Sequence, residues 1–312
     1  MNAVANVVRA ELFKLAHKKR TYVLAGLYWI LYPALVLIVG NVIRVNLAGS
    51  FIDGNVPVGT LLHELASPFG LARVALVGPG YMSPSFYMII IALVAALLIG
   101  EERSQNMWKT TLVAQPQRLA VLTGKFLVAW LAFAVLVIGA TVFAFLFGAL
   151  GTTFLGTGFS GDWSGLLTGM VMQVLFGAAG ISFAFLLIFM LRNVALGIVS
   201  VFFLPALLEG LYMAYATLVG FQPVTAFNAV FQFLRLQNTL EELPRYFFTS
   251  NLYAPSRGLV GSVLTDLGIP AEAGGGLLFS TLPLSHSAMV MGGYFVVFAL
   301  LLAWRFKRHD VA

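Results

Sequence analysis

The chain has 312 residues, of which 60% are hydrophobic and only 10% are charged. Soluble domains carry about 25% charged residues, so this composition excludes an ordinary water-soluble globular protein and indicates a bilayer as the solvent. Cysteine is absent, which excludes disulfides and thiolate sites. The net charge of +6 comes from basic residues beside apolar runs, which favours a role in membrane topology over nucleic-acid binding.

Residues 1–21 predict an amphipathic helix on the inner leaflet. Four apolar residues share one helical stripe: Val4, Val8, Leu12 and Leu15. Glu11 falls near this apolar arc. Five basic residues are expected to face anionic headgroups: Arg9, Lys14, Lys18, Lys19 and Arg20. The alternative is a solvated basic leader that only fixes the topology.

Six apolar segments are long enough to cross a bilayer, which takes about 20 residues. We expect membrane-spanning helices at 22–43, 84–100, 126–150, 166–191, 194–219 and 287–304. The first is too long for a signal peptide, whose apolar core has about 7–15 residues. The sequence therefore predicts one all-α integral membrane domain over residues 1–312.

The positive charges predict the orientation of these helices. Thirteen of the 18 lysines and arginines fall in the N-terminal segment, the second and fourth connections and the C-terminal end. The positive-inside rule then places both termini in the cytoplasm, as an even number of crossings also requires. The long external connections, 44–83 and 220–286, are expected to contain short helices, since the second is too rich in aromatic residues for a disordered segment.

No catalytic motif emerges from the sequence. His63-Glu64 lacks the second histidine of a zinc-protease helix, and Gly124-Lys125 lacks the flanking residues of a phosphate-binding loop. The glutamate pairs 101–102 and 241–242 lie outside the predicted spans, which argues against an intramembrane protease. We therefore expect no catalytic residue, metal site or cofactor on this chain.

Two polar residues lie inside predicted spans. Glu209 is expected to reach the outer interface, to cap a break after Pro205, or to line a translocation path. Gln173 is expected either to form interhelical hydrogen bonds or to line the same path. Small residues at Gly165-x-x-x-Gly169 and Gly177-x-x-Gly180 predict close helix packing.

The second connection, residues 101–125, is the most informative part of the chain. It predicts a short helix, a break at Pro116 and a further helix that leads into the third span. An ordinary charged connector is the alternative. Nine residues in or directly after this connection carry a resemblance: Glu101, Glu102, Asn106, Trp108, Lys109, Pro116, Arg118, Lys125 and Phe126. Through them the connection resembles the corresponding loop in permease subunits of the second class of ABC exporters.

The Asn-x-Trp-Lys step is similar to the branch of this family linked to lantibiotic and peptide-antibiotic immunity, whose external loops are shorter. The resemblance implies a coupling helix that docks on a separate ABC ATPase, with Trp108 as the apolar anchor. Glu101, Glu102, Lys109 and Arg118 would orient that helix, and Lys125 would lie at headgroup level.

The same resemblance implies the partners of the chain. ATP and magnesium would be held by two copies of the ATPase, and a second permease subunit, identical or homologous, would complete the exporter. A bacterial cytoplasmic membrane is the expected location, and antibiotic resistance a plausible context. A secondary transporter or channel that needs no ATPase, or a membrane sensor or scaffold, are the alternatives. The sequence leaves the substrate open among peptide antibiotics, lipids, polysaccharides and small drugs.

Overall fold

Most of the described chain is helical. The computed structural model describes residues 2–47, 51–52, 56–57, 66–77, 86–100, 102, 113, 117–155, 158–159, 161–191, 193–219, 242–255 and 282–308. The strands among these residues form a small antiparallel ribbon, in which β1 (Phe51–Ile52) pairs with β2 (Val56–Pro57).

Five described helices are long and apolar enough to cross a membrane. The first consists of α2 (Lys19–Gly26), the π-helical turn η1 (Leu27–Leu31) and α3 (Tyr32–Leu47), and the others are α9 (Arg118–Leu155), α10 (Trp163–Met190), α11 (Val194–Val219) and α16 (Leu284–Arg308). The chain thus has the structure of an all-α, multi-pass membrane protein.

The segment expected to cross at 84–100 is shorter than these five. It consists of α6 (Phe86–Ala95) and a second π-helical turn, η2 (Ala96–Gly100). Together they extend about 22 Å at 1.5 Å per residue, less than the roughly 30 Å of a bilayer core. This segment is nevertheless almost wholly buried between its neighbours.

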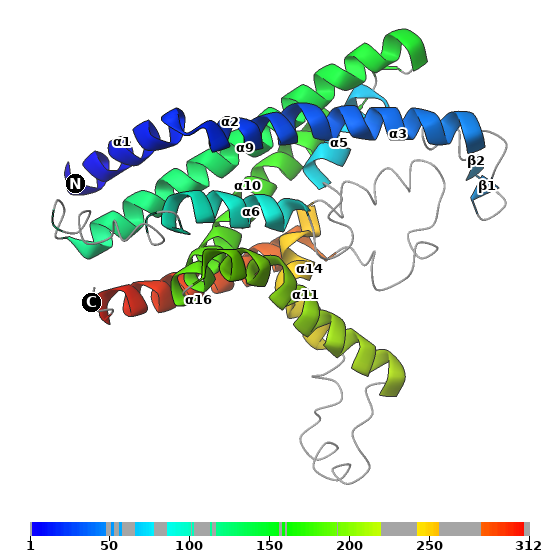
Figure 1. Ribbon diagram of the computed structural model, residues 1–312. Helices are drawn as coiled ribbons and strands as arrows, with labels where there is room; N and C mark the ends of the chain where they lie inside the picture. Colours follow the sequence, from blue (N-terminus) through cyan, green and yellow to red (C-terminus); the bar gives the residue numbers. More distant parts are fainter. Residues whose placement is uncertain are drawn as a thin grey trace.

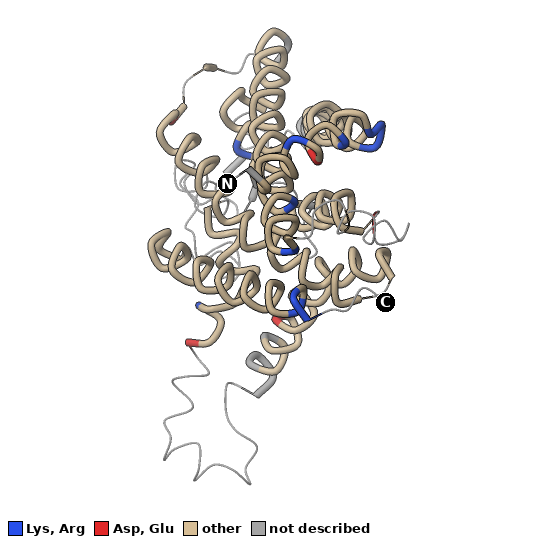
Figure 2. The backbone as a smooth tube through the Cα atoms, turned by 90° about the vertical axis from the view of Figure 1, so that its left-hand side faces the viewer, with Lys and Arg blue, Asp and Glu red and all other residues tan. Residues whose placement is uncertain are grey.

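Both termini lie at the same end of the helix bundle, on the left of Figure 1. Helix α1 (Asn2–His17) also lies at this end, and a break at Lys18 separates it from α2. Figure 2 looks onto this end and shows the lysines and arginines that gather there. We refer to it below as the terminus end.

Helix α10 is the centre of the bundle. In its most apolar stretch of 18 residues, 67% is buried, compared with 39% in the corresponding stretch of α9 and 17% in that of α11. Asp162 caps its first turn by accepting hydrogen bonds from the backbone N–H groups of Ser164 and Gly165, each 2.9 Å long. Gly177 and Gly180 provide the predicted close packing. A Cβ atom at Gly177 would lie 2.2 Å from the ring of Phe133 on α9, and one at Gly180 would lie 2.6 Å from Ile91 on α6.

The outward face of α9 carries a continuous apolar stripe. Its members recur every three or four residues, so they share one side of the helix. Each is more than 40% exposed: Leu131, Val135, Ile138, Val142, Leu146 and Leu150. A stripe of this size outside the packed core is what a lipid-facing surface requires.

The two long connections that the sequence predicts to be external contain short helices, as expected. Helix α5 (Pro68–Val77) packs back along α9, and its Phe69 ring meets the ring of Phe145 edge-on at 5.4 Å. In the last connection, the 3-10 turn η4 (Leu243–Tyr246) precedes α14 (Phe248–Leu252), which packs against α10, α11 and α16.

Helix α9 begins at Arg118, so residues 118–125 form the helix that the sequence predicts ahead of the third span. One local expectation differs from the structure. Helix α11 continues through Pro205, so Glu209 does not cap a break there. Packing of neighbouring helices can compensate for the hydrogen bond that proline removes.

Candidate functional site

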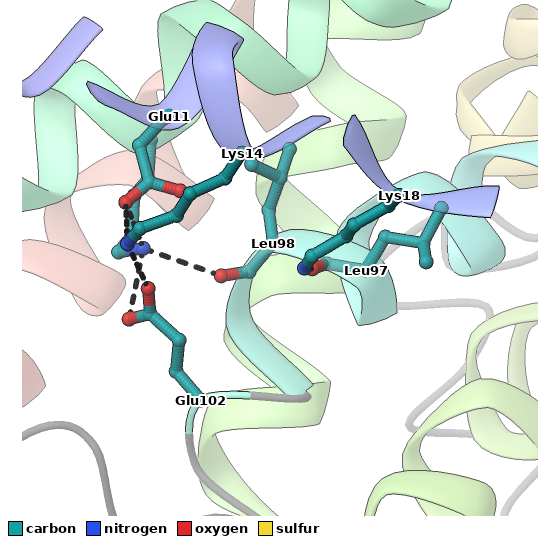
Figure 3. Close-up of polar contacts among 7 residues, drawn as sticks. Glu11, Lys14, Lys18, Leu97, Leu98 and Glu102 are labelled. Carbon is teal, nitrogen blue, oxygen red and sulfur yellow. Dashed lines mark hydrogen bonds and ion pairs between the residues drawn. The ribbon is translucent and has the colours of Figure 1, made fainter. Parts of the chain in front are cut away.

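A cluster of four charged side chains lies at the terminus end, where three segments meet (Figure 3). Glu11 and Lys14 come from α1, Glu102 follows η2, and Lys125 lies on α9. Lys14 Nζ lies 2.9 Å from Glu11 Oε1 and 2.8 Å from Glu102 Oε1. Lys125 Nζ lies 2.8 Å from Glu11 Oε1 and 2.9 Å from Glu102 Oε2, the latter an ion pair without hydrogen-bond geometry.

Three of these four charges are removed from solvent. The side chain of Lys125 is fully buried, and those of Glu11 and Glu102 are 5% and 8% exposed, whereas that of Lys14 is 40% exposed. Burying a charge costs several kcal/mol unless an opposite charge compensates it. Each ammonium group here contacts both carboxylates, so every buried charge has a compensating partner.

Two lysines also bind backbone carbonyl groups of η2, the turn that precedes Glu102. Lys18 Nζ donates to the carbonyl oxygen of Leu97 at 2.9 Å, and Lys125 Nζ donates to that of Leu98 at 3.4 Å. The last carbonyl groups of a helix lack partners within it and carry partial negative charge. The lysines therefore stabilise the end of η2, immediately before Glu102.

The cluster shifts the pKa values of Glu102 and Lys14 in opposite directions. Burial would raise the pKa of the Glu102 carboxyl, but the Lys125 and Lys14 ammonium groups outweigh it and lower that pKa. Burial would likewise lower the pKa of Lys14, but Glu102 and Glu11 outweigh it and raise that pKa. Both groups are therefore charged at neutral pH.

Apolar packing holds α1 in this position. Gly124 lies next to Lys125 on the face of α9 that α1 covers. A Cβ atom at Gly124 would lie 2.6 Å from Val7 Cγ1, closer than such contacts allow. The absence of a side chain at Gly124 lets α1 approach α9 closely enough for Glu11 to reach Lys125.

The structure brings together four of the residues predicted to act at this end: Lys14, Lys18, Glu102 and Lys125. Arg118 lies at the start of α9 and donates to the carbonyl oxygen of Lys307 at the end of α16, at 3.3 Å. Arg9, Lys19 and Arg20 are exposed. Glu101, Asn106, Trp108, Lys109 and Pro116 lie outside the described residues.

The structure gives protein partners to two of the lysines that were expected to face lipid headgroups. Lys14 on α1 contacts Glu102, and Lys18, at the break after α1, donates to the end of η2. Sequence reasoning also missed the role of Glu11. Its place near the apolar arc of α1 was the indication, because a carboxylate on a buried face needs a buried partner.

The two polar residues inside predicted spans lie in different surroundings. Gln173 is 1% exposed in the packed core, where its backbone oxygen accepts a 2.6 Å hydrogen bond from the Tyr87 hydroxyl on α6. Glu209 lies on the wall of a cavity of about 330 Å³ between α10, α11, α14 and α16. It accepts hydrogen bonds from the backbone N–H and the hydroxyl of Thr249.

Metal chemistry has no candidate ligands in the part of the chain that the structure describes, where no three His, Cys, Asp or Glu side chains are grouped. Comparison with known proteins gives no match: no protein family, no curated protein and no solved structure resembles the chain closely enough. Function must therefore be inferred from these residues and their geometry.

Proposed function

We propose that this chain is the membrane-spanning subunit of an ATP-driven exporter and that a separate ATPase subunit supplies the energy. The observation that supports this most is the position of the four-charge cluster. Glu102 precedes the segment 103–117 and Lys125 follows it by two turns of α9, and both are paired with α1. The two sides of the predicted coupling loop are thereby joined to one rigid body.

This arrangement suits the transmission of force. A partner that pushes on residues 103–117 would displace Glu102 and the start of α9 together, because separating buried partners costs about 3–5 kcal/mol. Helices α6, α9 and α1 would then move as a unit. Trp108 would anchor the loop in the partner, since buried aromatic residues dominate small interfaces.

The proposal includes six crossings with both termini in the cytoplasm. Phe86–Gly100 would be the second crossing, completed by residues before Phe86. Six crossings are half of the usual set in such exporters, so a second permease subunit, identical or homologous, would be needed. The apolar face of α11, of which little is buried, offers a surface for that subunit. Two ATPase copies would hold ATP and magnesium.

Affinity purification from native membranes tests the proposal. The wild-type chain should retain a P-loop ATPase identified by mass spectrometry, and Trp108→Ala should lose it while still inserting into the membrane. Trp304→Ala is the matched control, since Trp304 is a half-exposed tryptophan at the terminus end, near the end of α16.

Two results would contradict the proposal. One is ATP hydrolysis by the purified chain alone. The other is labelling of residues 103–117 from outside the cell, measured with single cysteines introduced into this cysteine-free sequence. Retention of the ATPase by Trp108→Ala would remove Trp108 from the anchor role.

A further inference from the structure

The cavity of about 330 Å³ between α10, α11, α14 and α16 has an almost wholly apolar wall. Of the lining residues that the structure describes, all but Glu209 are apolar or aromatic. Six of them carry aromatic rings: Phe183, Tyr212, Phe247, Phe248, Tyr294 and Phe298. Sites for small molecules have volumes of about 300–1,000 Å³ and mostly apolar and aromatic walls, so both the size and the composition of this cavity suit a ligand.

The cavity lies in the half of the bundle opposite the four-charge cluster. Leu208 is about 21 Å along α11 from Val194, and Tyr294 is about 15 Å along α16 from Leu284. Both positions fall inside helices that are long and apolar enough to cross a membrane. Helix α14 closes one side of the cavity (Figure 1).

The approach to the cavity is apolar as well. Leu204 and Leu208, one turn apart on α11, line the cavity and are 38% and 59% exposed. The exposed residues Leu207 and Leu211 extend this surface along the same helix. An exposed apolar face on a membrane-spanning helix lies away from water, so a ligand would enter the cavity from the membrane interior.

The Glu209 carboxylate is already bound within the protein. The Thr249 backbone N–H donates to Glu209 Oε1 at 2.9 Å, and the Thr249 hydroxyl donates to Oε2. Placing an apolar molecule beside a polar group is costly when that group has no hydrogen bond, but both oxygens here accept one. A ligand in this cavity therefore does not have to supply a donor to Glu209.

The rings of the wall are held by contacts with one another. Phe248 meets Tyr294 edge-on at 5.2 Å and Phe298 edge-on at 5.8 Å. The centroid of the Phe183 ring lies 5.3 Å from that of Phe248 and 5.1 Å from that of Phe298. Rings that meet edge-on or offset attract each other beyond the area they bury, so a ring of a ligand would gain more here than an aliphatic chain.

We propose that this cavity binds a neutral aromatic molecule dissolved in the membrane. Its ring would lie against Phe248 and Phe298, and its entry would pass Leu204 and Leu208. A lipid acyl chain fits less well, because it has no ring to pair with those of the wall. The proposal goes beyond the transport function, because this binding needs no ATPase.

Photolabelling of the purified chain in phosphatidylcholine nanodiscs tests the proposal. The probe is a trifluoromethyl phenyldiazirine, a neutral aromatic molecule that inserts into nearby side chains on illumination, and mass spectrometry maps the labelled residues. Excess tert-butylbenzene should reduce labelling of the cavity wall by about tenfold. The exposed stripe of α9 from Leu131 to Leu150 is the internal control, because labelling from bulk lipid is not saturable, and its labelling should change by less than about twofold.

Two pairs of variants locate the site. Leu204→Trp fills the cavity with a larger side chain, so the concentration of tert-butylbenzene that gives half protection should rise by about tenfold. Leu207→Trp, at an exposed position on α11 outside the cavity wall, should change it by less than about twofold. Phe298→Leu removes a ring and should raise it by about threefold to tenfold, whereas Phe203→Leu, an exposed ring outside the wall, is its control.

A competitor without a ring tests the class of the ligand. The saturated analogue tert-butylcyclohexane has a similar size, and it should need a concentration at least about threefold higher for the same protection. The inference is overturned if tert-butylbenzene protects no residue of the cavity wall, as expected if an acyl chain fills the cavity. It is also overturned if Leu204→Trp and Phe298→Leu behave as the wild type, or if the two competitors protect equally.

Labelling of the α9 stripe also reports whether each variant is folded, since it should be the same as in the wild type. None of these results depends on whether an ATPase drives transport, so failure of this inference and failure of the proposed function are distinguishable.

Discussion

The bundle holds carboxylates at both ends, but in contrasting surroundings. At the terminus end, Glu11 and Glu102 each contact two ammonium groups, and the cluster is buried. In the opposite half, Glu209 accepts hydrogen bonds from neutral donors of Thr249 and faces aromatic rings. Opposite charges that are buried together stabilise a fixed arrangement of segments, whereas the segments around Glu209 are held mainly by apolar and aromatic packing.

This comparison separates two tasks within one chain. The four-charge cluster joins three segments whose contact with each other is maintained by opposite charges. Around the cavity beside Glu209, α14 packs against both α11 and α16, and the residues that line the cavity are mostly apolar. We therefore expect substitutions at the cluster to affect stability strongly and those at the cavity to affect stability only slightly.

The largest expected effect is that of Lys125→Met. It removes the fully buried ammonium group and leaves Glu11 and Glu102 with Lys14 alone, so the free energy of unfolding should fall by about 3–5 kcal/mol. Thermal unfolding in nanodiscs measures this. Lys307→Met, an exposed lysine near the end of α16, is the control and should change stability by less than about 0.5 kcal/mol. Equal effects of the two changes would refute the structural importance of the cluster.

The next effect concerns Glu102→Gln and its dependence on pH. At neutral pH the variant loses the negative charge that pairs with Lys125 and that accepts the hydrogen bond from Lys14, and a hydrogen bond to a charged group is worth about 1.5–3 kcal/mol. Because folding lowers the pKa of Glu102, its stabilising effect is present above the ordinary carboxyl value and is lost as the pH falls through the lowered folded value.

Unfolding temperatures of the wild type and of Glu102→Gln should therefore differ at pH 7, begin to approach each other below about pH 4.3, and converge only below the lowered pKa of Glu102 in the folded protein. The expected convergence comes from protonation of the wild-type carboxyl, which then resembles the neutral amide. A difference that stays constant down to low pH would show that Glu102 does not titrate as described.

A third prediction compares two glycines in helices. Gly124→Ala should force α1 away from α9, because the new Cβ atom would lie 2.6 Å from Val7 Cγ1, and should cost about 1–3 kcal/mol. Gly292→Ala on α16 has nothing within 4 Å and should stabilise the helix by up to about 1 kcal/mol. The sign of the two shifts in unfolding temperature is the measurement, and a shared sign would contradict the close approach of α1.

The smallest effect is expected at the cavity. Thr249→Val removes the hydroxyl that donates to the Glu209 carboxylate but keeps the backbone donor. Because Glu209 is only partly buried, stability should fall by about 1.5 kcal/mol, the low end for a hydrogen bond to a charged group. Thr141→Val is the matched control, because the Thr141 hydroxyl donates only within its own helix, to the carbonyl oxygen of Val137. A cost for Thr249→Val as large as that of Lys125→Met would remove the distinction between the two ends.

The sequence predicted the membrane helices well, because apolar length is a property of composition. The helices α10 and α11 begin and end within a few residues of the predicted 166–191 and 194–219. The segment 84–100 was harder to judge, since a buried crossing and a shorter buried helix have similar composition. The turns η1 and η2 were not predicted, because a π-helical turn has no characteristic composition.

The candidate sites were predicted only as single residues. Glu102, Lys125 and Lys14 were each identified, but nothing in their spacing shows that α1 brings Glu11 between them. Glu11 and Lys125 are 114 residues apart in the sequence. The partner of Glu209 was equally hidden, because Thr249 lies 40 residues away in the last connection. Such pairings depend on tertiary packing, which local periodicity does not encode.

The π-helical turn η2 sets the direction in which Glu102 leaves the axis of α6. A π-helical turn accommodates one more residue than an α-helical turn in the same register. If Ala96–Gly100 rewound as α-helix without losing a residue, Glu102 would swing by about 100° around the axis of α6 and leave both of its lysines. Deleting one residue from this turn would allow a regular α-helix while Glu102 still faces Lys14 and Lys125. Rewinding of the turn could then no longer rotate Glu102 away from these lysines.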